Sequence, residues 1–319
     1  MSLPFGREHK TMNENDQQKI KSKLEGQENQ ALDTLYQDCI KLVRYSIHEK
    51  IDKESIERIV GLVADIFKKD LYNELLLMFY RESKDNFMYA HIVNNMILSI
   101  AFASSLELSR EDIMDIGYCA FGHDFGMMDY FDLFQKPVQL TDQEKQSIYN
   151  HPQKSAELFK SYFSERVIHG ILDVHECVNG KGYPQGKVGG EMSFLAKIVS
   201  VCDIFEALTH ARNFRSEFNP YTAIKMIIKK KDSMFEKLII KKFVEFISIY
   251  PIGSFVRINT GEVGIVVASN PRCPNRCIIH VLLDSSKELR FSGKIINLVN
   301  DPMLYISGII DLNLREVRK

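Results

Sequence analysis

The stretch GHDFGMMD, Gly122 to Asp129, places an imidazole next to a carboxylate at the end of an otherwise apolar run. On a helix, neighbouring side chains point about 100° apart, so His123 and Asp124 could both reach one ion on the flank between them. A carboxylate buried in such a run is costly unless a cation or a hydrogen-bond donor meets it. We therefore expect a positively charged group beside this pair.

The chain on both sides of this octet has a helical pattern, from about residue 29 to residue 246. Within residues 56–67, for example, the apolar residues recur at the helical period and share one face. Ser109 followed by Asp112 is typical of the start of a helix, and this helix would run directly into the octet. The sequence therefore predicts a mainly α protein.

Around Tyr250 the pattern changes to alternating β-branched residues, with turn signals at Thr260-Gly261 and Asp284-Ser285. This pattern predicts a small C-terminal β module, either a barrel or a curled sheet. The first 28 residues are hydrophilic and lack apolar periodicity, so we expect disorder there. The predicted organisation is residues 1–28 disordered, 29–84 an N-terminal helical region, 85–245 a helical catalytic domain and 246–319 the β module.

The composition argues against several classes of protein. With a net charge of −1 over 319 residues, the chain has no strong positive electrostatic field that would attract a nucleic acid polymer or an anionic membrane. No signal peptide is visible, and no run approaches the roughly 18 to 20 apolar residues that a membrane span needs. Six scattered cysteines favour a reducing compartment. We therefore expect a cytoplasmic protein that binds any anionic ligand through a local cluster of residues.

Four histidines and two aspartates in the helical region could form such a cluster with a metal ion. Imidazole and carboxylate together suit first-row metals such as iron, manganese or zinc. Each histidine alone is weak evidence, since a single histidine on an apolar helical face is more often an ordinary core or surface residue. The candidate ligands are His91, His123, Asp124, His151, His175 and Asp203.

Two further segments carry groups suited to phosphate. The loop VHECVNGKGYPQGKVGG, Val174 to Gly190, combines glycines that permit tight backbone geometry with Lys181 and Lys187, although a plain surface turn explains it equally well. Arg212 and Arg215 form a fork suited to anionic oxygens, with a solvated charged face as the alternative.

Taken in order, these motifs resemble the HD-GYP family of metal-dependent phosphodiesterases, a branch of the HD superfamily. The resemblance covers about residues 85–231 and rests on the octet, ECVNGKGYP and CDIFEALTHAR. The segment IYPIGSFVRINTGEVGIVV is similar to the module that follows this domain in many members. The resemblance implies an all-helical catalytic domain with a bi- or trinuclear metal centre that hydrolyses cyclic dinucleotides, most often cyclic di-GMP.

Carried over to matching positions, the resemblance makes the six candidates metal ligands and makes Asp124 the bridge between two divalent ions, iron or else manganese. Asp124 and His123 would then serve catalysis, in which the ions activate a water for in-line attack on the phosphate. The resemblance assigns substrate binding to Lys181, Gly182, Tyr183, Arg212 and Arg215. It also implies a linear dinucleotide or GMP as product, and a homodimer or a partner protein that contacts the Gly-Tyr-Pro loop.

This sequence departs from the family pattern at four positions. Met127 replaces the usual lysine of HDxGK, and Val174 replaces the first histidine of HHE. Asn179 replaces an aspartate, and Phe87 replaces the glutamate that supports a third metal. We therefore predict a binuclear site with a loosely held second ion. Three functions remain open: a working phosphodiesterase, a binding protein without turnover, and a phosphohydrolase for another phosphate ester whose Gly-Tyr-Pro loop serves a partner.

Overall fold

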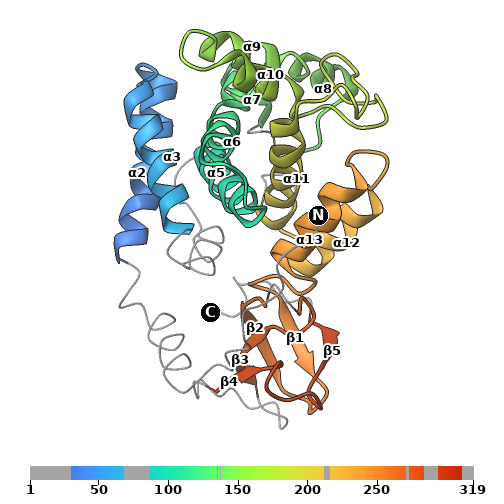
Figure 1. The fold of residues 1–319 in the computed structure, drawn as a ribbon. Helices are drawn as coiled ribbons and strands as arrows, with labels where there is room; N and C mark the ends of the chain where they lie inside the picture. The colour runs from blue at the N-terminus through green and yellow to red at the C-terminus, as the bar shows by residue number, and fades with distance from the viewer. Residues whose placement is uncertain are drawn as a thin grey trace, which may run out of the picture.

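The computed structural model describes residues 30–67, 87–134, 136, 138–211, 216–270, 273–283 and 294–310. A helical body is followed by a small β-sheet (Figure 1), and this confirms the predicted fold class. The disorder predicted for residues 1–28 lies outside the described residues.

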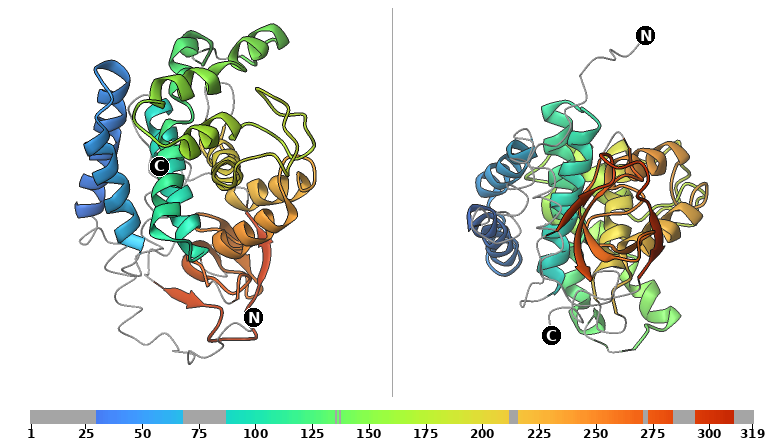
Figure 2. Two further views of the ribbon diagram at one scale, coloured as in Figure 1. Left: turned by 45° about the horizontal axis from the view of Figure 1, so that its top comes forward. Right: turned by 90° about the horizontal axis from the view of Figure 1, so that it is seen from below.

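The central helix of the body is α5 (Phe87–Ser105), which is buried at every position from Met88 to Ala103. The other described helices are α2 (Gln30–His48), α3 (Lys53–Phe67), α6 (Arg110–Gly122), η1 (Phe125–Tyr130), α7 (Phe131–Phe134), α8 (Asp142–Ile148), α9 (His151–Phe159), α10 (Glu165–Asp173), α11 (Phe194–Thr209), α12 (Pro220–Lys229) and α13 (Lys237–Ile247). We predicted that no run is long and apolar enough to span a membrane, but the length and composition of α5 meet that requirement. In the structure, 89% of this apolar window is buried inside the molecule, as in the core helix of a helical bundle. It packs against α2, α3, α6, α11 and α13, and both views in Figure 2 show it within the bundle.

The octet lies at the end of α6 and not within a continuous helix. Ser109 caps the start of α6 by accepting a hydrogen bond from the backbone N–H of Asp112, as its position predicts. The helix ends at Gly122, and the chain then tightens into the 3-10 turn η1. Asp124 sits at this break, with φ −106° and ψ 8°. The two side chains are therefore directed by a helix end, and not by the regular helical flank that we expected.

The tight turn η1 is held against α9 by Gly126 and Ser155. The backbone N–H of Gly126 donates to Ser155 Oγ over 2.8 Å, and Ser155 Oγ donates to the carbonyl of His123 over 2.7 Å. A Cβ atom on Gly126 would lie 2.2 Å from the carbonyl oxygen of His151. The absence of a side chain here lets α9 approach closely enough to bring His151 beside Asp124.

The described strands of the C-terminal module form one antiparallel sheet in the order β4-β3-β2-β1-β5. The strands are β1 (Phe255–Ile258), β2 (Val263–Ala268), β3 (Ile278–Leu283), β4 (Ile295–Asn297) and β5 (Ile306–Ile309). The predicted turn at Thr260-Gly261 connects β1 and β2, whereas Asp284 and Ser285 lie outside the described residues. The sheet has a hydrophobic core of its own, formed by Val256, Ile258, Val266, Cys277, Ile279, Val281, Ile296 and Leu298.

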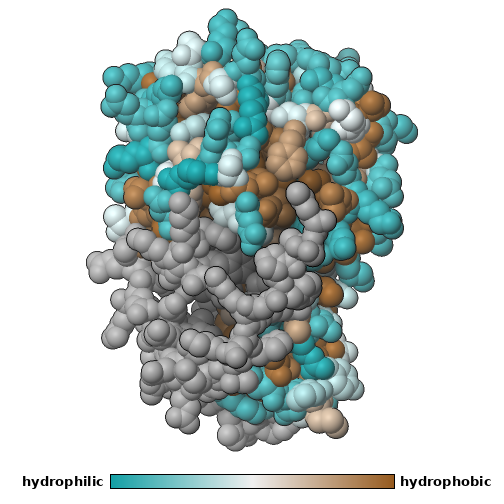
Figure 3. All heavy atoms as spheres, in the orientation of Figure 1, coloured by the Kyte–Doolittle hydropathy of each residue, from teal (hydrophilic) through white to brown (hydrophobic). Residues whose placement is uncertain are grey.

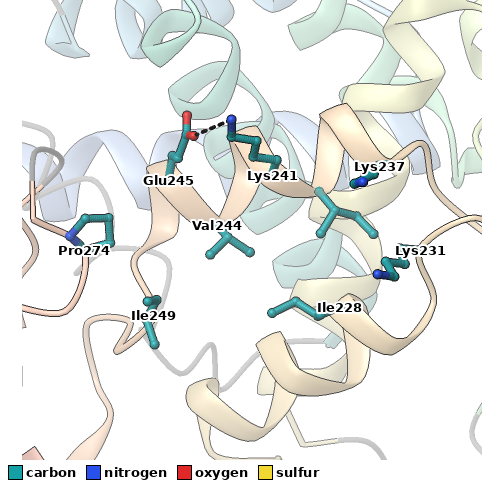
Figure 4. A pocket seen from close by; sticks show the side chains of 9 residues that line it. Ile228, Lys231, Lys237, Lys241, Val244, Glu245, Ile249 and Pro274 are labelled. Atoms are coloured by element: carbon teal, nitrogen blue, oxygen red, sulfur yellow. Dashed lines mark ion pairs between the residues drawn. The ribbon is translucent and has the colours of Figure 1, made fainter.

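Hydrophilic side chains cover most of the upper part of the face in Figure 3, and apolar side chains gather in a band below them. On α12 and α13, an apolar groove of about 370 Å³ extends to Pro274 of the β module (Figure 4). None of the six candidate ligands lines it. The groove is therefore separate from the chemistry that the motifs predict.

We expect Gly126→Ala to destabilise the fold by about 1–3 kcal/mol or more, because the added methyl group would collide with the backbone of α9. Chemical denaturation of the full chain measures this loss. The control is Gly190→Ala, since a Cβ atom at Gly190 would have no heavy atom within 4 Å. Equal stability of the two variants would contradict the proposed close packing of η1 on α9.

Candidate metal centre

The structure brings all six predicted ligands together from five separate parts of the helical body. The α5 and α11 helices supply His91 and Asp203, and the end of α6 supplies the adjacent pair of the octet. The other two histidines stand at the start of α9 and just after α10. Five of the six residues are buried, namely His91, His123, Asp124, His151 and Asp203, and His175 is partly buried.

The Asp124 carboxylate lies at the centre, with its two oxygens turned toward different histidines. Its Oδ2 atom is 3.2 Å from Nε2 of His91. Its Oδ1 atom is 3.2 Å from Nε2 of His151 and 3.3 Å from Nε2 of His175. The side chains thus form two groups that share one carboxylate, one with His91 and His123 and the other with His151 and His175.

Asp203 adds a second carboxylate to the first group. Its Oδ1 atom is 3.1 Å from Nε2 of His91 and 3.8 Å from Nε2 of His123. Its other oxygen, Oδ2, lies 4.0 Å from Nδ1 of His175 in the second group, and Val174 beside that histidine is buried in the hydrophobic core. Asp203 therefore lies nearer to His91 than to His175, with one oxygen toward each group.

Backbone carbonyl groups orient two of the imidazole rings. Nδ1 of His123 lies 2.8 Å from the carbonyl oxygen of Ala120, and Nδ1 of His151 lies 2.8 Å from that of Ile148. A carbonyl can only accept, so each Nδ1 must carry a proton, and in the neutral ring each Nε2 then presents a lone pair. This arrangement is typical of metal-binding histidines, whose second nitrogen donates to a carbonyl or carboxylate.

The Nε2 atom of His151 provides a direct test of whether a metal fits. It is buried and accepts no hydrogen bond from any residue that the structure describes, yet it lies 3.2 Å from Asp124 Oδ1. A lone pair that faces a carboxylate at this distance is repelled unless a proton or a metal cation lies between the two atoms. The donors, all nitrogen and oxygen, suit a divalent first-row ion. The residues present therefore fit a metal centre.

Charge couples the carboxylates of the cluster to its imidazoles. Burial lowers the pKa of His123, but Asp124 and Asp203 outweigh burial and raise this pKa above its usual value. Burial raises the pKa of Asp124, but the neighbouring His123, together with the imidazoles of His151 and His175, outweighs burial and holds this pKa well below its usual range. Burial lowers the pKa of His175, which favours the neutral ring that a metal requires. An ionised carboxylate thus faces imidazole nitrogens that can coordinate.

Glu206 orients His91, and the sequence analysis did not single it out. Its carboxylate Oε2 accepts a hydrogen bond from Nδ1 of His91, which directs Nε2 of that ring toward Asp124 and Asp203. Glu206 is buried and stands three residues after Asp203 on α11. That i, i+3 spacing within CDIFEALT was the signal that could have identified it.

The Gly-Tyr-Pro loop is organised by Glu176, the glutamate of the His-Glu pair. The buried carboxylate accepts hydrogen bonds from the backbone N–H groups of Gln185, Gly186 and Lys187 at 2.7, 3.0 and 3.0 Å. A Cβ atom on Gly182 would lie 2.4 Å from the Cα of Glu176. Gly182 therefore serves the close packing of the loop, whatever contact it makes with a substrate.

The two lysines of this loop differ in what they can contact. Lys181 is exposed and could meet a phosphate. Lys187, which we also considered for that role, pairs through Nζ with the buried Asp173 at 2.7 Å. Arg212 and Arg215 lie outside the described residues.

Tyr183 is stacked on both faces of its ring. The ring of His175 lies 5.1 Å away at 9°, and that of Tyr149 lies 4.2 Å away at 12°. Because both rings lie parallel to it, the predicted substrate-binding residue Tyr183 could stack on a nucleotide base only if Tyr149 moved. Tyr149, which we did not predict, forms the outer, 39% exposed end of this stack.

At the four positions that depart from the family pattern, the structure shows other roles. Met127 is buried in the hydrophobic core, as is Val174. Asn179 is exposed and closes a turn by accepting from the backbone N–H of Lys181. Phe87 begins α5 one turn before His91. The sulfur side chain beside Asp124 therefore supplies packing and no hydrogen-bond donor.

Comparison with known proteins agrees with this architecture. Residues 89–238 match the model of the HD domain, and residues 255–317 match that of a KOW domain associated with the HD domain. The chain therefore carries an HD domain, followed by a KOW-like five-stranded antiparallel sheet.

Similar proteins are phosphodiesterases of cyclic dinucleotides. A cyclic di-GMP phosphodiesterase of Pseudomonas aeruginosa is 32% identical over 63% of this chain and 49% of its own length. The cyclic di-GMP phosphodiesterase PdeB of Borreliella burgdorferi is 24% identical over 63% of this chain and 54% of its own. The 3'3'-cGAMP-specific phosphodiesterase 1 of Vibrio cholerae is 26% identical over 54% and 37%. The chain thus spans about half the length of the first two.

We expect Asp124→Asn to lose bound metal from both groups, since the shared carboxylate loses its charge and one acceptor oxygen. Elemental analysis after reconstitution of the metal-free protein with Mn²⁺ measures the loss as ions per chain. Asp129→Asn is the control, because Asp129 is exposed and pairs with Lys154 outside the cluster. Retention of full metal content by Asp124→Asn would contradict a shared carboxylate.

Glu176→Ala removes the acceptor of three backbone N–H groups, so the amides of Gln185, Gly186 and Lys187 should exchange with solvent deuterium at least several-fold faster. Hydrogen exchange measured by mass spectrometry reports on these peptides. In the control, Glu191→Ala, a single acceptor of the Val188 N–H group is lost from the same loop. Equal exchange in the two variants would show that Glu176 does not organise the loop.

Proposed function

Because the chain carries an HD domain and its candidate ligands meet around one carboxylate, we propose that it is a metal-dependent phosphohydrolase acting on a cyclic dinucleotide, with cyclic di-GMP as the first candidate. The observation that carries this proposal is the pair of donor groups that share Asp124. Two such groups suit a binuclear centre, which is a common device for hydrolysing phosphate esters.

Each residue has a definite part in this proposal. His91, His123 and Asp203 would hold one divalent ion, His151 and His175 would hold the other, and Asp124 would contribute to both. Iron is the first candidate and manganese the second, since both accept mixed nitrogen and oxygen ligands. The bound ions supply charge that activates water and stabilises the phosphate under attack. Glu206 and the backbone carbonyls keep the imidazole rings turned toward the ions.

The substrate class is proposed from the relatives and from the loop beside the site. The P. aeruginosa and B. burgdorferi relatives are cyclic di-GMP phosphodiesterases. The exposed Lys181 supplies a positive charge for a phosphate. The stack from His175 through Tyr183 to Tyr149 supplies aromatic surface near the candidate ligands. We propose that Arg212 and Arg215 add positive charge to the same ligand.

A second candidate function is cyclic-dinucleotide binding without turnover. The observation that favours it is Met127, a buried thioether within η1 that stands three positions after Asp124. A lysine at this position in the family pattern could donate to water or phosphate, whereas a thioether cannot. Loss of one donor in a comparable catalytic site costs about a hundredfold or more in rate.

The deciding experiment measures hydrolysis and binding on the same protein. We expect the full chain, reconstituted with Fe²⁺ or Mn²⁺ without oxygen, to convert cyclic di-GMP to linear dinucleotide or GMP, resolved by chromatography. Asp124→Asn should abolish product and Asp129→Asn should keep it. Binding of cyclic di-GMP without product would favour the second function, and turnover of simple nucleotides alone would contradict both.

A further inference from the structure

A chain of hydrogen bonds leads from the N-terminal helix α2 to the candidate metal centre. The hydroxyl of Tyr36 donates to Oδ1 of Asn94 over 3.0 Å. Nδ2 of Asn94 donates to Oε1 of Glu206 over 3.3 Å. The other carboxylate oxygen of Glu206 accepts from Nδ1 of His91. Helices α2 and α11 thus contribute one side chain each to this connection, and α5 contributes two, Asn94 and the candidate ligand His91.

All members of this chain are buried. Tyr36 and Glu206 are 1% exposed, Asn94 is 0% and His91 is 3%. In such surroundings a polar group that loses its partner is costly, and a fully connected network fixes the orientation of each member. Burial, and next the charge of Glu206, raise the pKa of Tyr36, so its hydroxyl keeps the proton that it donates.

The direction of the Asn94 amide depends on Tyr36. A hydroxyl that donates to Oδ1 keeps the carbonyl end of the amide toward α2 and the NH₂ end toward Glu206. Without that hydroxyl, Oδ1 of Asn94 loses its donor, and the amide is held through its Nδ2 end by Glu206 and by Nε2 of His210, 3.4 Å away, so that its bond to Glu206 is less firmly positioned. Glu206 would then hold the ring of His91 less firmly.

We propose that Tyr36 is a positioning residue for the metal centre, acting through Asn94 and Glu206 on His91. The inference rests on the metal site of the proposed function, but not on the substrate. It gives a role to a helix that lies before the matched HD domain of residues 89–238 and that carries no ligand motif. In metal sites of known type, a change in such outer partners typically weakens metal binding by about 10–100-fold.

The α2–α5 interface offers a matched control. Tyr89 of α5 is also buried, and its hydroxyl lies 2.6 Å from Nε2 of His48 on α2. Tyr89→Phe therefore removes a hydroxyl contact between the same two helices without touching Asn94. A purely structural effect on helix packing would appear in both variants, whereas an effect on metal binding should appear only in Tyr36→Phe.

The experiment titrates Mn²⁺ into the metal-free full chain by calorimetry, with thermal denaturation of each metal-free variant as a check on folding. We expect Tyr36→Phe to weaken the tighter site roughly tenfold, and Tyr89→Phe to change it less than twofold. The double variant Tyr36→Phe/Asn94→Ala should bind no more weakly than Asn94→Ala alone, since Tyr36 acts only through Asn94.

Each result decides the inference. Equal Mn²⁺ affinities of Tyr36→Phe and Tyr89→Phe, or a further loss in the double variant, would overturn it, as would a wild-type chain that binds no Mn²⁺. A wild-type chain that binds Mn²⁺ but does not hydrolyse cyclic di-GMP would refute the proposed phosphodiesterase and leave this inference to be judged on the affinities.

Discussion

The burial of one carboxylate, that of Asp124, is the constraint on which the helical body depends. An ionised carboxylate can be buried away from water only if positive charge or hydrogen-bond donors surround it. The body meets this requirement by ending α6 at Gly122, by bringing α9 against the following turn and by directing histidines from four segments toward the same point. The helices around α5 are therefore arranged so that donors and imidazoles surround the buried charge of Asp124.

Two further buried glutamates position the residues that surround the candidate metal centre. Glu206 faces inward and orients His91, while Glu176 faces away and gathers backbone N–H groups of the Gly-Tyr-Pro loop. The two residues of the His-Glu pair therefore have different roles. His175 belongs to the ligand cluster, and Glu176 holds the loop in which Tyr183 stacks on His175. Loop and centre are built as one unit, so a change in either alters the other.

Much of this could be predicted from the sequence, because local periodicity reports which face of a helix is buried. The helical body, the β module and the six side chains that meet were all predicted in this way or from the family resemblance. The contacts of Tyr149 with Tyr183, and of Tyr36 with Asn94, join residues distant in the chain and leave no local pattern. The break in the helix after Gly122 was also missed, because apolar residues follow His123 and Asp124 as well as precede them and so give no local sign of a helix end.

The complete burial of α5 has an evolutionary consequence. A helix with neighbours on every side has no face on which substitutions are neutral, and His91, Asn94 and Asn95 add polar requirements to those of shape. Related chains should therefore diverge slowly along this segment, while the outer helices and the exposed end of the aromatic stack are free to drift. New substrate preferences would then arise by substitution of exposed residues around the site, while the sequence of α5 stays nearly constant.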